Sequence, residues 1–129
     1  MIMTTVWIVN DKTKYLEPHL DYLCERGYDA RLFDNINGPI DLLEEGFSFD
    51  YAFIDLALRE KRSSICEESD SVILAERMRR LCPDGIRIVT SVCEPGKLLR
   101  YFDAFLEAPF RPSEMLEMIE TPKERYRKF

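Results

Sequence analysis

Short apolar runs alternate along the chain with stretches in which apolar residues recur every three or four positions. The runs are rich in β-branched and aromatic residues, and they predict strands at residues 6–9, 30–33, 51–54, 86–89 and 104–106. Strands that alternate with helices build a parallel sheet with helices on both faces. We therefore predict an α/β fold of three layers, with a doubly wound sheet of five parallel strands in the middle.

The first helix is indicated by leucines at helical spacing. Leu16, Leu20 and Leu23 lie on one stripe of a helix that is expected to end at Gly27. Pro18 fits this helix only in its first turn, where a missing N–H is not needed. The sequence therefore predicts that this helix starts late.

The later helices are predicted by the same spacing. They are expected over residues 37–46, from about residue 71 to 81, and from Pro112 onward. Residues 95–101 leave room for only about two turns of a fourth helix, and the polar residues 59–70 predict a long loop. The stripes of the three longer helices hold Ile40, Leu42, Leu43, Val72, Ala75, Met78, Leu81, Leu116 and Ile119.

Polar side chains stand where three of the predicted strands end. Asp55 follows the unbroken apolar run 51–54, which is typical of a central parallel strand buried on both faces. Asn10 and Asp11 end the first strand, and Thr90 ends the fourth. The carboxyl ends of parallel strands are where open α/β sheets bind ligands, so we expect these side chains to converge. Taken singly, each would be an ordinary cap, loop or strand-end residue.

The expected cluster suits phosphate chemistry. Two carboxylates and an amide oxygen are ligands for a hard cation such as Mg²⁺. Asp55, placed between that cation and the hydroxyl of Thr90, would be positioned for in-line attack on a phosphoryl group. Ser91 is the alternative source of the hydroxyl.

Four segments, at residues 6–11, 27–29, 50–55 and 105–116, resemble the receiver domains of bacterial response regulators in order and spacing. The resemblance covers nearly the whole chain. It implies a flavodoxin-like topology with strand order 2-1-3-4-5. It also implies a role in phosphorelay signal transduction, with a partner histidine kinase or phosphotransfer protein as phosphate donor.

The resemblance also assigns roles to single residues. Asp55 is implied as the phosphate acceptor, Thr90 as the hydrogen-bond donor to the phosphoryl group, and Phe105 as the aromatic switch residue, without a phenol hydroxyl. Asp11, Asp55 and Asn10 are implied as the Mg²⁺ ligands, and Asn10 stands where the family has an acidic residue. Binding of Mg²⁺ is therefore expected to be weak.

Three features depart from the family pattern. Ala108 stands where the family has a lysine that contacts the phosphoryl oxygens, and Lys97 and Arg100 are only neighbours in sequence. The loop after Asp55 is longer than usual, and the fourth helix is shortened. These departures favour an alternative in which the chain is a pseudo-receiver, a protein-interaction module that needs no phosphate.

A small metal-dependent phosphoryl-transfer enzyme is a third hypothesis, which the sequence disfavours. A dedicated general base is not evident, because the single histidine, His19, falls within the first helical pattern, where a surface or packing role is expected. We therefore predict a signalling protein that is not an enzyme and that acts by binding a downstream signalling protein.

Charge and cysteine content exclude other classes. The net charge is −6, although residues 123–129 form a basic tail after a domain at residues 1–122. An acidic body argues against a nucleic-acid partner. The four cysteines form no CxxC pair, so neither zinc nor a disulfide framework is predicted, and Cys24 and Cys82 are expected as packed, reduced thiols. Neither a leader nor a membrane segment is indicated, so we expect a cytoplasmic protein without a membrane partner.

Overall fold

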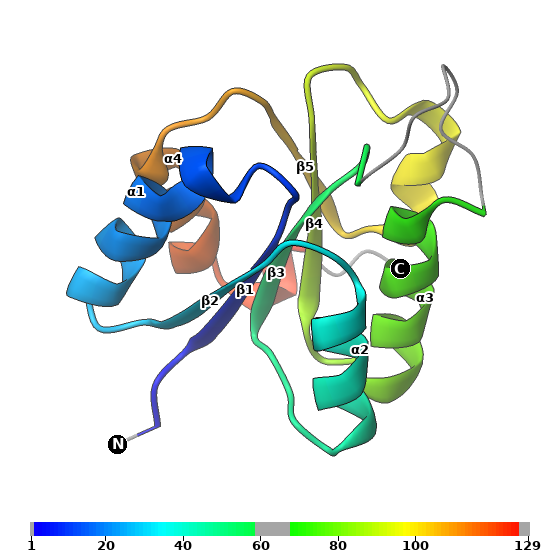
Figure 1. Ribbon diagram of the computed structural model, residues 1–129, viewed down its shortest axis with the longest axis horizontal. Helices are drawn as coiled ribbons and strands as arrows, with labels where there is room; N and C mark the ends of the chain where they lie inside the picture. Colours follow the sequence, from blue (N-terminus) through cyan, green and yellow to red (C-terminus); the bar gives the residue numbers. More distant parts are fainter. Residues whose placement is uncertain (1, 59–67, 127–129) are drawn as a thin grey trace.

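The computed structural model describes residues 2–58 and 68–126, and the strands in this part of the chain run parallel in one sheet (Figure 1). Their order across the sheet is β2-β1-β3-β4-β5, as the resemblance implied. Each strand contains the predicted run and extends it by one or two residues. The strands are β1 (Thr5–Val9), β2 (Asp29–Phe33), β3 (Tyr51–Asp55), β4 (Ile86–Ser91) and β5 (Ala104–Glu107).

Helices cover both faces of the sheet, which confirms the three predicted layers. On one face lie α1 (Thr13–Glu25) and α4 (Pro112–Glu120) (Figure 1). On the other face lie α2 (Asn37–Glu44), α3 (Asp70–Leu81) and the 3₁₀-helix η1 (Gly96–Tyr101). A second 3₁₀-helix, η2 (Lys123–Arg125), follows α4. Within residues 2–58 and 68–126, none of these helices combines the length and the apolar character needed to cross a bilayer.

The two cores arise from alternate side chains of the central strands. Val6 and Ile8 of β1 belong to the core under α1 and α4, whereas Trp7 and Val9 belong to the core under α2 and α3. The strand β3 is buried throughout except at its last residue, Asp55. This is the burial predicted for a central strand, and it places a carboxylate where the sheet opens to solvent.

The position of Pro18 corrects the expectation that the first helix starts late. Because α1 begins at Thr13, Pro18 lies in its second turn. A proline there removes the hydrogen bond that its N–H would donate to the carbonyl of Lys14. Lys14 and Pro18 are both exposed, so the proline lies on the solvent side of α1, where the carbonyl group that loses its partner can be hydrated.

Two other positions differ from the predicted burial. Leu81 is 41% exposed, because α3 ends there and the neighbouring Cys82 takes the buried place, with its Sγ 3.5 Å from the carbonyl oxygen of Phe49. Cys24 is an exposed free thiol rather than a packed one. Most of the predicted loop, at residues 59–67, and with it Cys66, lies outside the described residues.

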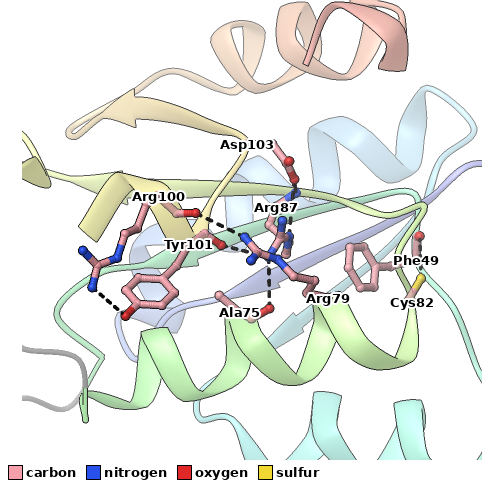
Figure 2. A network of polar contacts seen from close by, with 8 residues as sticks. All are labelled: Phe49, Ala75, Arg79, Cys82, Arg87, Arg100, Tyr101 and Asp103. Carbon is pink, nitrogen blue, oxygen red and sulfur yellow. Dashed lines mark hydrogen bonds and ion pairs between the residues drawn. The ribbon is translucent and has the colours of Figure 1, made fainter. Parts of the chain in front are cut away.

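A buried arginine anchors the short helix η1, which replaces a full fourth helix as predicted. The Nη1 of Arg87 in β4 donates hydrogen bonds to the carbonyl oxygens of Ala75 in α3, at 3.2 Å, and Tyr101 in η1, at 2.9 Å (Figure 2). Its Nε lies 3.4 Å from Oδ2 of Asp103, and the same oxygen accepts the backbone N–H of Arg87 at 2.8 Å. One guanidinium therefore ties β4, α3 and η1 together.

The first part of the predicted basic tail contacts the domain. Lys123 Nζ lies 3.1 Å from Oδ1 of Asp50, and the hydroxyl of Tyr126 donates to the carbonyl oxygen of Met118 at 2.7 Å. The Tyr126 ring lies edge-on to Tyr51. Residues 123–126 are thus held against the start of β3, at the opposite end of the strand from Asp55.

Candidate functional site

Side chains from four strand ends line one cleft at the carboxyl edge of the sheet. The cleft has a volume of about 290 Å³, and the strand ends that line it point to the upper edge of the sheet in Figure 1. Asn10 follows β1, Asp55 ends β3, Thr90 lies in the last part of β4, and Ala108 follows β5; all four line the cleft. The expected convergence of Asn10, Asp55 and Thr90 is therefore what the fold produces.

Asp55 is half-buried at the centre of this arrangement. Burial raises the pKa of its carboxyl group above the ordinary value, and the nearby negative charge of Asp11 raises that pKa further. A hydrogen bond from the backbone N–H of Ala57 and the positive charge of Lys12 act in the opposite direction and lower this pKa. Because the net shift is upward, the protein holds this carboxylate in an environment that disfavours its charge.

Two hydroxyl groups lie beside Asp55. Thr90 is paired with Asp55 across the β3–β4 ladder and is buried, and its carbonyl oxygen accepts the N–H of Leu56 at 2.9 Å. Ser91 also lines the cleft, but its Oγ already accepts the backbone N–H of Cys93 at 3.1 Å. Both hydroxyls are in place, and the direct pairing of Thr90 with Asp55 favours Thr90.

The end of β1 supplies the other oxygen donors. The Asn10 side chain lines the cleft, and its Oδ1 accepts the backbone N–H of Lys12 at 2.9 Å. Asp11 is exposed and is not part of the lining, although its charge reaches Asp55. In the described part of the chain, no three His, Cys, Asp or Glu side chains are grouped so as to hold a metal ion. Of the two carboxylates that the resemblance implies as cation ligands, Asp55 lines the cleft and Asp11, contrary to the expected convergence, does not.

The far wall of the cleft carries no charge. Ala108 is held by a hydrogen bond from its N–H to the carbonyl oxygen of Ser91, at 2.8 Å, and Phe110 closes the wall beside it. His19 supports this wall from behind, since it is buried with its Nε2 2.8 Å from the carbonyl oxygen of Phe110. Phe105 is half-buried against the core under α2 and α3 and does not line the cleft.

Two polar lining residues, Lys12 and Tyr15, were not among the site residues predicted from the sequence. Lys12 immediately follows the Asn10-Asp11 pair, and Tyr15 comes one helical turn later on α1. Their proximity in sequence to Asn10 and Asp11 is the feature from which their place in the cleft could have been predicted. Lys97 and Arg100, in contrast, do not line the cleft.

No family model matches the chain, and no curated protein matches it either. Solved structures do match. A receiver domain protein from Methanospirillum hungatei JF-1 is 20% identical with a TM-score of 0.78, and the alignment covers 97% of each chain. The chain has the receiver-domain fold. The beryllofluoride-activated NtrC4 receiver domain dimer is 21% identical, with a TM-score of 0.76 over 97% of this chain and 100% of that one.

A third solved structure that matches the chain is of a phosphorylated protein. The response regulator from Burkholderia pseudomallei, which contains a phosphorylated aspartic acid, a calcium ion and citrate, is 17% identical. Its TM-score is 0.73, over 95% of this chain and 69% of that one. At these identities the likeness establishes the fold alone, and the roles of Asp55, Thr90 and Phe105 stay predictions.

The raised pKa of Asp55 predicts a pH-dependent stability effect. Between its ordinary pKa of 3.8 and its higher native pKa, the native state binds a proton that the unfolded chain has lost, so stability falls as pH rises through this interval. Asparagine does not ionise. We therefore expect Asp55→Asn to raise the melting temperature at neutral pH by about 2–5 °C, and the gain to vanish at about pH 3, below both pKa values.

Circular dichroism melts of both proteins in EDTA, at pH values from acid to neutral, would measure this effect. Asp21→Asn is the matched control, because Asp21 is an exposed carboxylate on α1, and its melting temperature should follow that of the unmodified protein. A gain for Asp55→Asn that is the same at both ends of the pH range would contradict the assignment to Asp55 ionisation.

Proposed function

We propose that the chain is a phosphate-accepting signalling module in which Asp55 takes up a phosphoryl group. The observation that carries the proposal is the cleft that Asp55, Asn10 and Thr90 share at the carboxyl ends of the strands. Open α/β sheets bind their ligands at this edge. The receiver fold gives the proposal further support, since the matched structures include one with a phosphorylated aspartic acid.

The transfer balances with a phosphohistidine as donor. A carboxylate oxygen of Asp55 attacks the phosphorus, and a P–O bond forms as the P–N bond breaks. The electron pair of the broken bond leaves with the imidazole, which binds a proton. The hydroxyl of Thr90 donates a hydrogen bond to a phosphoryl oxygen, with Ser91 as the alternative donor. Only the ionised form of Asp55 attacks, so phosphorylation declines in acid.

The oxygen donors beside Asp55 fit Mg²⁺. The carboxylates of Asp11 and Asp55 and the amide oxygen of Asn10 are hard ligands of the kind that this ion prefers. The charge of Asp11 raises the pKa of Asp55, so the two carboxylates lie near enough to repel each other. A bound Mg²⁺ would offset this repulsion and the repulsion of the incoming phosphate. Asn10 contributes no charge, so the ion is expected to bind weakly.

The proposed partners follow from this chemistry. A histidine kinase or a phosphotransfer protein supplies the phosphoryl group, and a downstream signalling protein responds to the charge added at Asp55. We place this relay in the cytoplasm, with no role for nucleic acid or membrane. The free thiols of Cys24, Cys82 and Cys93 are consistent with a reducing compartment.

Beryllofluoride, a stable phosphoryl mimic, tests the proposal directly. At millimolar Mg²⁺ we expect beryllofluoride to shift the amide NMR signals of Lys12, Asp55, Ala57 and Thr90, and EDTA to abolish the shifts. Asp55→Asn should abolish them as well, whereas Asp21→Asn should leave them unchanged. An unmodified protein that shows no shift near Asp55 under these conditions would overturn the proposal.

A pseudo-receiver is the second candidate function, and the uncharged wall at Ala108 favours it. In that case the partner binds the fold itself, and Asp55→Asn would leave partner binding intact. Binding that is lost only under phosphorylating conditions would exclude the pseudo-receiver.

A further inference from the structure

Charge is distributed unevenly around the cleft. Among the lining residues that the structure describes, Lys12 and Asp55 alone carry a charge. The wall on the β5 side consists of Ala108, Pro109 and Phe110. The positive charge in this lining therefore belongs to Lys12, on the β1 side of the cleft.

The chain holds Lys12 in a defined position. The Oδ1 of Asn10 accepts the backbone N–H of Lys12 at 2.9 Å, so the side chain of one lining residue fixes the backbone of another. Lys12 is also the N-cap residue of α1, so the start of that helix fixes its place on the wall of the cleft.

We propose that Lys12 binds the phosphoryl group on Asp55, with its ammonium group contacting the phosphoryl oxygens. This inference rests on the proposed function, and it names the residue of this chain that neutralises the added charge. Lys12 takes no part in making or breaking the bond to phosphorus. Its role is to bind the group once it is in place and while it is transferred.

The electrostatics of the cleft support this role. Phosphorylation replaces a single negative charge at Asp55 by about two, next to the negative charge of Asp11. Lys12 and Asp55 line the same cleft, so the positive charge of Lys12 lies on the wall of the space in which a phosphoryl group on Asp55 would stand. Neutral residues of the β5 wall offer no comparable attraction.

Lys14 provides a matched control at the same end of α1. It belongs to the first turn of α1 and is exposed, but it does not line the cleft. Removing its charge therefore changes the local net charge by the same amount as removing that of Lys12. The two lysines separate contact with the phosphoryl group from the general electrostatic field.

The experiment measures the affinity of the full chain for beryllofluoride at fixed Mg²⁺ by NMR titration. We compare the unmodified protein with Lys12→Gln, Lys12→Arg and Lys14→Gln. Lys12→Gln is expected to weaken binding about tenfold, the change produced by losing one charge-assisted hydrogen bond. Lys12→Arg should keep most of the affinity because the charge is retained, and Lys14→Gln should bind within about twofold of the unmodified protein. Melting curves confirm that each variant is folded.

The outcomes separate this inference from the proposed function. If the unmodified protein binds beryllofluoride and Lys12→Gln binds it equally well, the role of Lys12 is wrong and the proposed function stands. Equal weakening by Lys12→Gln and Lys14→Gln would also overturn the role of Lys12, because it would show a general field effect. If the unmodified protein fails to bind, the proposed function and the inference fail together.

Discussion

Replacing Asp103 with alanine is expected to lower the free energy of unfolding by about 3 kcal/mol. Asp103 Oδ2 pairs with the Nε of Arg87 and accepts its backbone N–H, at 3.4 and 2.8 Å. The Arg87 side chain is only 9% exposed, so the variant leaves a buried positive charge without its carboxylate and a backbone donor without its acceptor. Removing one partner of a buried ion pair destabilises a protein by more than a solvent-exposed ion pair stabilises it.

Urea unfolding followed by circular dichroism measures this loss. Asp103→Asn is the informative second variant, because an amide oxygen still accepts the Arg87 N–H while the charge is gone, and it should fall between alanine and the unmodified protein. Asp21→Ala, at an exposed site on α1, should change stability by less than about 0.5 kcal/mol. If Asp103→Ala also lowered the free energy of unfolding by less than about 0.5 kcal/mol, the carboxylate of Asp103 would not be needed to stabilise the buried charge of Arg87.

The same network explains why η1 is well placed although it is short. Isolated helices of this length are unstable in water, so η1 depends on its tertiary contacts. Arg87 binds the carbonyl oxygen of Tyr101, and Arg79 of α3 donates to the carbonyl oxygen of Arg100 at 3.1 Å (Figure 2). Side chains from β4 and α3 thus bind carbonyl groups of η1 and hold it beside the sheet.

The meeting of Asp55 with Thr90 was predictable, because it depends only on where buried strands end. A strand that is apolar throughout lies in the centre of a parallel sheet, and β3 and β4 are paired so that Asp55 faces Thr90. The loop before α1 was less predictable. The side-chain hydrogen bond between Asn10 and Lys12 sets its path, and hydrophobic spacing contains no information about such a bond. The hydrophobic pattern therefore gives no indication that Lys12 lines the cleft.

Long-range partners and helix ends account for the other differences. Arg87 interrupts an apolar run, and its counter-charge, Asp103, lies on another segment 16 residues away, so the sequence does not reveal the pairing. Pro18 was expected in a first turn, but it lies on the exposed side of α1, where a carbonyl group without its helical partner costs less than in the core. Cys24 was expected to be packed because it lies near the end of a helical pattern. Such a position does not determine which side of the helix the residue faces, and Cys24 is exposed.

The largest single loss of stability is expected from a substitution at Trp7, in the core between the sheet and the helices α2 and α3. Trp7 of β1 is 1% exposed, and its ring lies 5.1 Å from the ring of Phe49 and 5.7 Å from that of Phe33. Trp7→Ala removes the indole from both contacts and leaves a cavity that the surrounding strands and helices fill only in part. We expect the free energy of unfolding to fall by about 4 kcal/mol.

Urea unfolding followed by circular dichroism tests this expectation, and Trp7→Phe supplies the comparison because it keeps an aromatic ring at the position. Trp7→Phe should lose less than half as much stability as Trp7→Ala, since a smaller cavity remains. Ile2→Ala changes an apolar side chain that is 97% exposed and should be neutral. Trp7 is the one tryptophan of the chain, so its emission in the unmodified protein reports burial independently. Emission at the wavelength of solvated indole, or a loss below about 1 kcal/mol for Trp7→Ala, would contradict the packing of β1 against α2 and α3.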